Sequence, residues 1–310
     1  MKPSGCAGGA WGIESTAVDG GRRETLLFEA SLLSAAIALG TNPVAVKYAV
    51  GGISPLPFVA LRFTSAGLLL LVLLYFLESG GGLKWKDSFS MAGLGLLGVG
   101  LNNVLFTFGV DLTSASNTAL IYATPPLWGM LLGFVLGLER PKLRGILGVG
   151  LALLGVGAIV YGGLGAGESS LSGDLLVSGA AICWGTYTAL SPLLLRKYSP
   201  LAVAGYTMLV AGLGVLPLAL PDLLRTDWGT VSVEAWAAIL YSTLVVAAFA
   251  FFAWQRGVSR IGANRVLVYQ YLITLTGVAS GVALLGESLG TNKIVGGAII
   301  LVGVYLARRQ

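Results

Sequence analysis

The sequence predicts an all-α polytopic membrane protein whose ten transmembrane helices form two inverted five-helix repeats. Three observations lead to this fold class. The composition is too apolar for a soluble domain, ten apolar segments have membrane length, and the second half of the chain repeats the first at an offset of about 146 residues.

The composition indicates that most of the protein surface faces lipid. Hydrophobic residues make up 55% and charged residues 11% of the 310 residues, and the mean hydropathy is +0.85. A soluble domain normally has about a quarter of its residues charged. The polar surface is therefore too small for a soluble fold of this length, and the chain is expected to lie in a lipid bilayer.

Ten segments are long and apolar enough to cross that bilayer. A helix needs about 20 predominantly apolar residues to span a hydrocarbon core of about 30 Å. Such segments lie at residues 29–50, 56–77, 89–110, 114–136, 144–162, 174–195, 200–221, 234–255, 262–284 and 290–307. Each half of the chain therefore has five predicted spans.

The positive charges support this count, because Lys and Arg collect in cytoplasmic loops. With the N-terminus in the cytoplasm, 15 of the 19 Lys and Arg residues fall on the cytoplasmic side: Lys2, Arg22, Arg23, Lys84, Lys86, Arg140, Lys142, Arg144, Arg196, Lys197, Arg256, Arg260, Arg265, Arg308 and Arg309. We therefore expect a multi-pass protein of the cell (inner or plasma) membrane with both termini in the cytoplasm. The positive charges form no basic stripe, so no nucleic-acid partner is expected.

The predicted spans divide the chain into four parts. Residues 1–27 are rich in Gly and Ser and lack the apolar region of a cleavable signal peptide, so they are expected to form a disordered cytoplasmic tail. The first repeat covers residues 28–162 with helices 1–5, a linker covers 163–173, and the second repeat covers 174–310 with helices 6–10.

The two halves match at specific residues. The pairs are Gly40 with Gly185, Thr41 with Thr186, Ser54 with Ser199, Pro55 with Pro200, Asn117 with Asn264, Tyr122 with Tyr269, Gly129 with Gly277, Gly133 with Gly281, and Glu139 with Glu287. An odd number of spans in each repeat inverts the second repeat in the membrane. Inverted repeats are typical of secondary transporters, which bind substrate near the bilayer midplane between the two halves.

Several of these segments resemble the EamA-type family of the drug/metabolite transporter superfamily. The strings are LGTNPVAVKYAV, SPLPFVALRF, LFTFGVDLTSASNTALIYATPPLWGMLLGFVLGLER, GDLLVSGAAICWGTYTALS, FAFFAWQRGVSRIGANRVLVYQYL and ALLGES, which together extend over nearly the whole chain after the tail. The resemblance implies ten helices in two inverted repeats, a central cavity and alternating access. It also implies export of amino acids or other small metabolites, as in many relatives.

Small and acidic residues at repeat-equivalent positions suggest structural roles. The Gly129-x-x-x-Gly133 motif of helix 4 recurs as Gly277-x-x-x-Gly281 in helix 9, which predicts close packing of these helices on each other or on neighbours. Glu139 and Glu287 end their spans, where capping at the membrane interface is the expected role.

Candidate substrate-binding residues are polar and aromatic side chains at mid-membrane depth, where polar groups are costly unless they are paired or face a cavity. We predict Thr41, Asn42, Asn103, Tyr122, Trp184, Tyr187, Tyr269, Gln270 and Tyr271. The alternative is that they hydrogen-bond between packed helices. Adjacent helical residues point about 100° apart, so only one of Asn102 and Asn103 is expected to face the cavity, and the resemblance favours Asn103. Proline breaks at Asn42-Pro43 and Pro125-Pro126 either kink the helices or open them to the cavity.

Arg62 is the tenth candidate, and it allows two interpretations. Its guanidinium could attract a substrate carboxylate, or it could snorkel to the outer membrane interface. The sequence favours snorkelling, because the equivalent position in the second repeat is Thr207.

Acidic residues and metal ligands argue against two other mechanisms. All 14 Asp and Glu residues lie in tails, in loops or at span ends. The small four-helix exporters of the superfamily use a glutamate in their first helix, where this chain reads SAAIALGTN, so proton antiport of that kind is not expected. The chain has no His and no Cys cluster, so neither a cofactor nor a metal is expected.

The function that the sequence favours is secondary transport, with export the expected direction, of a small neutral or zwitterionic metabolite such as an amino acid. A channel or a lipid flippase is the main alternative. A membrane-embedded enzyme fits least, because it would need a general base, a metal or paired carboxylates. The two repeats supply both sides of a pathway, so a monomer could suffice.

Overall fold

The structure of this chain, a computed structural model, describes residues 11–78, 82–135, 143–166 and 170–308. Every regular element within these ranges is helical, in the order α1 (Trp11–Val50), α2 (Pro55–Leu77), α3 (Trp85–Gly93), η1 (Leu94–Leu101), α4 (Asn102–Leu112), α5 (Ala115–Ile121), α6 (Pro125–Val135), α7 (Leu143–Ala166), α8 (Leu171–Leu195), α9 (Pro200–Arg225), α10 (Val233–Tyr241), η2 (Ser242–Ala250), α11 (Phe251–Ile261), α12 (Ala263–Val266), η3 (Leu267–Tyr269), α13 (Gln270–Leu285) and α14 (Thr291–Arg308). The all-α prediction is confirmed for this part of the chain.

Within the described part of the chain, eight helical segments are long and apolar enough to cross a membrane. They are Glu24–Val50, Pro55–Leu77, Trp85–Leu112, Ala115–Val135, Leu143–Gly162, Pro200–Arg225, Val233–Ile261 and Leu267–Leu285. The 25-residue α8 is not among them, because polar residues such as Thr186, Thr188 and Ser191 interrupt its apolar sequence. The apolar part of α14, Thr291–Leu306, is short. That α8 and α14 are the ninth and tenth spans stays a prediction.

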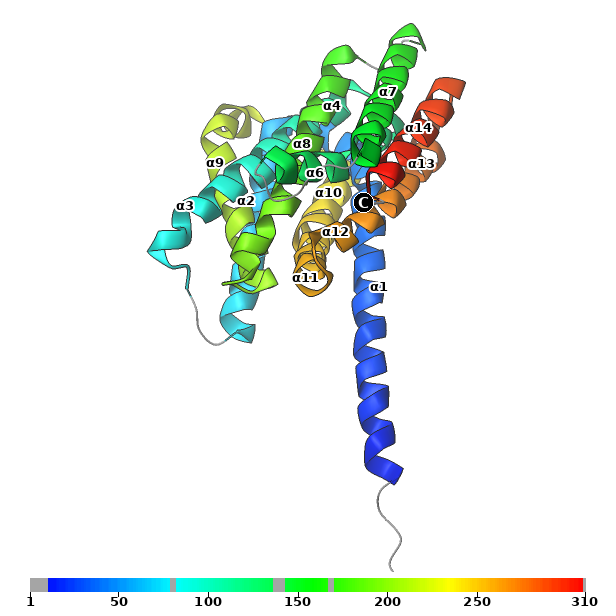
Figure 1. Cartoon of the computed structure of the whole chain (residues 1–310). Helices are drawn as coiled ribbons and strands as arrows, with labels where there is room; N and C mark the ends of the chain where they lie inside the picture. The colour runs from blue at the N-terminus through cyan, green and yellow to red at the C-terminus, as the bar shows by residue number, and fades with distance from the viewer. Residues whose placement is uncertain (1–10, 79–81, 136–142, 167–169, 309–310) are drawn as a thin grey trace, which may run out of the picture.

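Two boundaries differ from the sequence prediction. Helix α1 begins at Trp11, so residues 11–27 are helical where a disordered tail was expected, and Figure 1 shows this end of α1 projecting away from the other helices. Once the membrane-length part has nucleated, each further residue adds a helical hydrogen bond at little cost. For the same reason α7 extends to Ala166 and α8 starts at Leu171, which shortens the predicted linker at 163–173. Residues 1–10 and 167–169 lie outside the described residues.

The helices pack in a pattern that repeats between the two halves. Helix α2 packs along α9, and α7 along α14, which are repeat-equivalent pairs, and α7 and α14 lie side by side in Figure 1. The contact of α1 with α13, which joins the two halves, has its counterpart in the contact of α8 with α6. Helix α8 also packs against α4 and lies near the centre of the bundle.

Glycines allow the closest of these contacts. A Cβ atom on Gly40 of α1 would lie 2.6 Å from the carbonyl oxygen of Ile273 in α13, and one on Gly185 of α8 would lie 2.5 Å from the carbonyl oxygen of Pro125 in α6. These two glycines are repeat-equivalent. Gly277 likewise faces Ala119, so α13 and α5, from the predicted helices 9 and 4, pack closely, as the repeated glycine motif predicted.

The predicted third and eighth spans each contain a π-helical segment, η1 and η2. Their first residues, Leu94 and Ser242, are 148 positions apart (242 − 94), close to the repeat offset. A π-helix widens the turn and is found at functional sites, where it aims side chains away from regular positions. Sequence periodicity did not reveal either segment.

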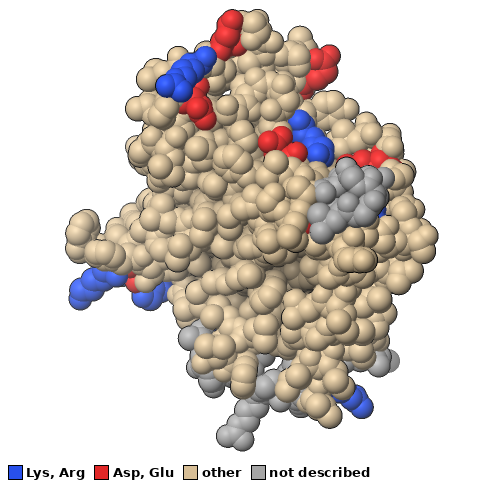
Figure 2. All heavy atoms as spheres, turned by 90° about the horizontal axis from the view of Figure 1, so that it is seen from above, with Lys and Arg blue, Asp and Glu red and all other residues tan. Residues whose placement is uncertain are grey.

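The outer surface of the bundle is apolar. Large hydrophobic side chains such as Phe76 (75% exposed), Leu154 (70%) and Leu224 (79%) point outward. Figure 2 views one end of the molecule and shows charged side chains only in small groups, most of them near the edge. Exposed apolar area of this extent fits a protein surrounded by lipid.

Candidate functional site

A central cavity lies between helices from both halves of the chain. Its lining comes from α1, η1–α4, α5 and its end, α8, η2–α11 and α13: Leu39, Gly40, Asn42, Pro43, Asn102, Asn103, Phe106, Ala119, Tyr122, Trp184, Phe251 and Ile273. The space between these atoms is about 510 Å³, of which the centre of a water molecule can reach about 40 Å³. The cavity is therefore narrow, and side chains must move apart to admit a molecule the size of an amino acid.

The cavity lies where the helices are irregular. Pro43 removes a backbone hydrogen bond inside α1, and the turn after α5 that holds Tyr122 ends at Pro125. Asn102 is the first residue after η1, and Phe251 is the first residue after η2. The predicted break at Asn42-Pro43 thus lines the cavity, although α1 continues through it.

Amide side chains form the polar wall. The Nδ2 of Asn102 donates to the Tyr122 hydroxyl at 2.9 Å and to the carbonyl oxygen of Ala180 at 2.6 Å. The Nδ2 of Asn103 donates to the carbonyl oxygen of Val99 at 3.0 Å and to Oδ1 of Asn102 at 3.0 Å. The expectation that only Asn103 faces the cavity is therefore wrong. The two amides bond to each other at the η1–α4 junction, and the cavity extends around both.

Asn42, on α1 of the same repeat, belongs to the same wall. Its Oδ1 accepts a hydrogen bond from the Ser242 hydroxyl at 3.1 Å. Thr41, the preceding residue, bonds instead to the Tyr241 hydroxyl at 2.6 Å and is absent from the lining. Thr41 thus joins α1 to α10, which is the interhelical role that the sequence left open.

Aromatic side chains form the apolar wall. Trp184 meets Phe251 edge to face at 5.0 Å between ring centroids, stacks on Tyr187 at 5.5 Å and contacts Trp254 at 5.6 Å. Of these four rings, Trp184 and Phe251 line the cavity. Tyr187 and Trp254 are fully buried one turn further along α8 and α11. The Tyr187 hydroxyl accepts from Nε2 of Gln255 at 3.0 Å, so Tyr187 supports Trp184 from behind.

The three candidates from the predicted helix 9 lie behind the cavity. Nε2 of Gln270 donates to the carbonyl oxygen of Tyr122 at 2.7 Å, which fixes the turn that carries that tyrosine. Tyr269 and Tyr271 pack against two separate hydrophobic clusters. From this segment Ile273 lines the cavity instead.

Arg62 lies in the core, so the snorkelling interpretation is wrong. It is 1% exposed, on the face of α2 that packs against η2, and its Nε donates to the carbonyl oxygen of Ser242 at 3.0 Å. The rings of Phe58 and Phe63 lie 5.6 and 4.9 Å from Cζ. Arg62 is absent from the lining. A single residue, Ser242, connects it to the lining residue Asn42.

The predicted site did not include several lining residues: Leu39, Gly40, Asn102, Phe106, Ala119, Phe251 and Ile273. Most are apolar, and an apolar residue on a membrane helix carries no signal that separates a cavity face from a packing face. Asn102 is the exception, since its amide at mid-membrane depth was visible in the sequence.

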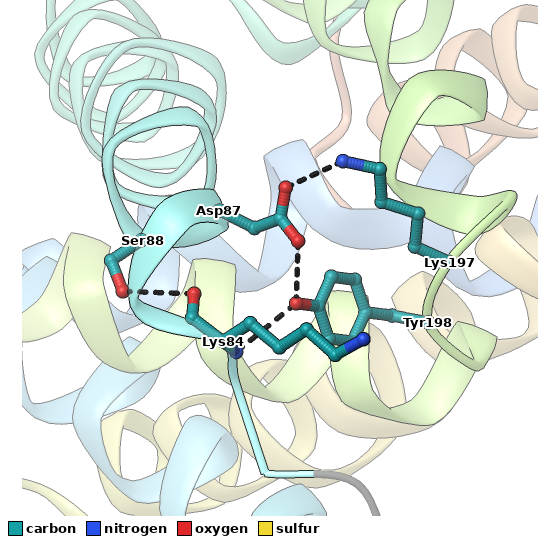
Figure 3. A network of polar contacts seen from close by, with 5 residues as sticks. All are labelled: Lys84, Asp87, Ser88, Lys197 and Tyr198. Atoms are coloured by element: carbon teal, nitrogen blue, oxygen red, sulfur yellow. Dashed lines mark hydrogen bonds and ion pairs between the residues drawn. The ribbon is translucent and has the colours of Figure 1, made fainter.

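A second polar site connects the start of α3 with the α8–α9 turn. Figure 3 shows the Asp87 carboxylate between Lys197 and Tyr198, with distances of 2.6 Å to Nζ of Lys197 and 2.8 Å to the Tyr198 hydroxyl. That hydroxyl also accepts from the backbone N–H of Lys84 at 3.1 Å. The hydrogen bond to Asp87 raises the pKa of Lys197 above its usual value, so the ion pair stays charged at neutral pH. Among the described residues, no three His, Cys, Asp or Glu side chains could hold a metal ion.

The fold and the cavity define a class, a helical multi-pass membrane protein with a central cavity shared by two sequence repeats. The model of the EamA-like transporter family matches residues 27–161 and 171–309, and the chain belongs to this family.

Individual proteins are also similar to this chain in sequence or in fold. The chain is 26% identical to the uncharacterized transporter YyaM of Bacillus subtilis (strain 168), over 89% of this chain and 92% of that protein. It is 29% identical to a protein named probable terminal-alkyne amino-acid exporter, from Streptantibioticus cattleyicolor, over 73% of this chain and 74% of that one. A protein of known crystal structure is similar in fold, with a TM-score of 0.63 at 19% identity, over 90% of this chain and 96% of that one.

Proposed function

We propose that this protein is a secondary transporter of the cell membrane that exports a small neutral or zwitterionic metabolite, such as an amino acid, by alternating access. Ten spans in two inverted repeats, with both termini in the cytoplasm, would form the pathway. The observation that carries the proposal is the central cavity, to which both repeats contribute: Asn102 lines it directly after η1 in one repeat, and Phe251 lines it directly after η2 in the other.

The symmetry of the helix packing supports alternating access. Two similar halves can exchange conformations, so that the cavity opens first to one side and then to the other. The matched contacts of α1 with α13 and of α8 with α6 are the crossings that such an exchange would change. The similarity to a protein named as an amino-acid exporter supports the substrate class and the direction.

The cavity lining fits a small molecule with both polar and apolar groups. Asn42, Asn102 and Tyr122 offer hydrogen-bonding groups, and Trp184 and Phe251 offer ring faces. From Trp184, the aromatic stack continues through Tyr187 toward the Leu195 end of α8, which is the cytoplasmic end in the proposed topology. Movement of these rings would open that side.

Counterflow in proteoliposomes tests the proposal. Purified protein loaded with an unlabelled amino acid should accumulate the same labelled amino acid and should saturate, whereas a channel would show neither. The variants Asn103→Ala and Trp184→Ala should each weaken the apparent affinity about tenfold, which corresponds to about 1.4 kcal/mol. Tyr269→Phe, outside the lining, is the control. Absence of counterflow for a panel of amino acids, nucleobases and related solutes under any ion gradient would contradict the proposal.

A further inference from the structure

Arg62 is an uncompensated positive charge next to the cavity. Its Nη1 and Nη2 atoms are buried and have no hydrogen-bond partner. Among the residues that the structure describes, the only salt bridge is that of Lys197 with Asp87, so no described carboxylate neutralises this guanidinium. A buried charge without a counter-ion is costly, and in membrane helices it usually marks a functional site.

Two sets of contacts connect the charge to the cavity. Nε of Arg62 bonds to the backbone of Ser242, whose hydroxyl bonds to the lining residue Asn42. The ring of Phe63, under the guanidinium, meets Phe251 edge to face at 5.9 Å, and Phe251 is part of the lining. The charge therefore lies one residue layer behind the cavity wall.

The apolar surroundings of Arg62 strengthen the electrostatic effect of its charge on the cavity. Phe58 and Phe63 cover the guanidinium, and water does not reach it. Electrostatic interactions are stronger in such a low-dielectric environment than in water. None of the described lining residues is acidic, so a substrate ammonium would meet amide oxygens, hydroxyls and ring faces among them.

We propose that Arg62 makes the cavity selective for carboxylates, so that the substrate is a small apolar carboxylate and an amino group on it is dispensable. This inference rests on the proposed function, because it names the substrate class of the same cavity. The Arg62 guanidinium attracts the substrate carboxylate electrostatically from behind the cavity wall, or turns its Nη atoms toward the carboxylate when Phe251 moves. Cationic compounds are excluded for the same reason.

Three probes that differ only in charged groups test the inference: L-leucine, isocaproate, which is leucine without its amino group, and isoamylamine, which is leucine without its carboxylate. Thermal unfolding of the purified full-length protein is measured with each probe at the same pH and ionic strength. Leucine and isocaproate should raise the unfolding temperature, and isoamylamine should not. Isocaproate should bind within about threefold of leucine, while isoamylamine should bind at least tenfold more weakly.

The variants separate charge from structure. Arg62→Met has a similar length and suits the apolar surroundings, so it should fold at least as stably as the wild type. Its preference for isocaproate over isoamylamine should be at least tenfold smaller than that of the wild type. Arg62→Lys should keep most of the preference, because it keeps the charge. Arg256→Met, which removes an exposed arginine of α11, is the matched control and should behave as the wild type.

Each outcome decides the inference. Equal binding of the carboxylates and the amine to the wild type, or an unchanged preference in Arg62→Met, overturns it. Failure of both carboxylates to stabilise the wild type also overturns it. If the carboxylates stabilise the wild type through Arg62 but no counterflow is seen, the inference holds and the proposed transport fails. If counterflow depends on Trp184 but not on Arg62, transport holds and the inference fails.

Discussion

At the scale of single residues, the polar wall of the cavity depends on amides that are bonded on several sides. The Asn102 amide donates to the Tyr122 hydroxyl and to the carbonyl oxygen of Ala180, and its Oδ1 accepts from Asn103. The Asn102 and Asn103 side chains are buried, so a lost partner leaves a desolvated polar atom there. This network fixes the direction of the Tyr122 hydroxyl at the cavity.

Removing the Asn102 amide should therefore destabilise the protein. We expect Asn102→Leu to lower the free energy of unfolding by about 1–3 kcal/mol, because the Tyr122 hydroxyl and the Asn103 amide lose a partner. Denaturant unfolding in detergent micelles measures the change. Ser90→Ala, at an exposed position of α3, serves as control. An Asn102→Leu protein as stable as the wild type would show that the network contributes little.

Glu287 has a structural role at the start of the short helix α5. Its carboxylate accepts from the backbone N–H of Ala115 at 2.7 Å and of Ser116 at 2.8 Å, and also bonds to the Ser116 hydroxyl. Backbone N–H groups at a helix N-terminus have no partner within the helix, and an acidic side chain satisfies them. The predicted capping role of Glu287 agrees with this geometry.

Neutralising this carboxylate should weaken the cap. We expect Glu287→Gln to reduce the free energy of unfolding by about 1 kcal/mol, because the amide keeps the shape but loses the charge and one acceptor. The exposed Glu78→Gln is the control and should change stability by less than about half that amount. Thermal unfolding of both variants gives the comparison, and equal effects would exclude a special role for Glu287.

At the scale of helices, two crossings enclose the cavity and depend on glycine. Gly40 brings α1 against α13, and its repeat mate Gly185 brings α8 against α6. A side chain at either position would meet backbone oxygen atoms, which cannot move without shifting a helix. The two crossings are equivalent, so they set how closely both halves approach the substrate.

Adding one methyl group at each crossing should therefore cost stability. Gly40→Ala and Gly185→Ala should each reduce the free energy of unfolding by about 1–3 kcal/mol through overpacking. Gly157→Ala in α7 is the matched control, because nothing lies within 4 Å of its added Cβ. It should be neutral or stabilising by up to about 1 kcal/mol, since alanine favours helix. Similar stabilities of all three variants would contradict the close crossings.

At the scale of the whole molecule, the proposed topology places both termini on the same side. Cys6 can report the N-terminus in a Cys183→Ala background, and Gln310→Cys the C-terminus in a protein without other cysteines. Both should react with a membrane-impermeant maleimide only from the cytoplasmic side. Gly229→Cys, in the turn between α9 and α10, should react only from outside. Reaction of the two termini from opposite sides would contradict two inverted repeats of five spans.

The sequence was sufficient for the features that depend on composition and repetition. The apolar content required lipid, and the family match over both halves agrees with the two repeats. Asn42, Asn103, Tyr122 and Trp184 were predicted for the site, and all four line the cavity. A polar or aromatic group at mid-membrane depth must be satisfied somewhere, and this cost makes it visible in a single sequence.

The tertiary structure decided which of these groups share one cavity and which join helices behind it. Thr41, Tyr187 and Gln270 carry the same signal as the lining residues, yet each bonds to a neighbouring helix. The direction of a side chain depends on helix crossings and on the π-helical segments η1 and η2, and these follow from packing between distant segments. The sequence by itself determined that Arg62 is a charge within the membrane region. Only the packing of α2 against η2 decided that this charge is buried beside the cavity. The neighbouring helices decide which face of a helix turns inward, and a single sequence does not contain that information.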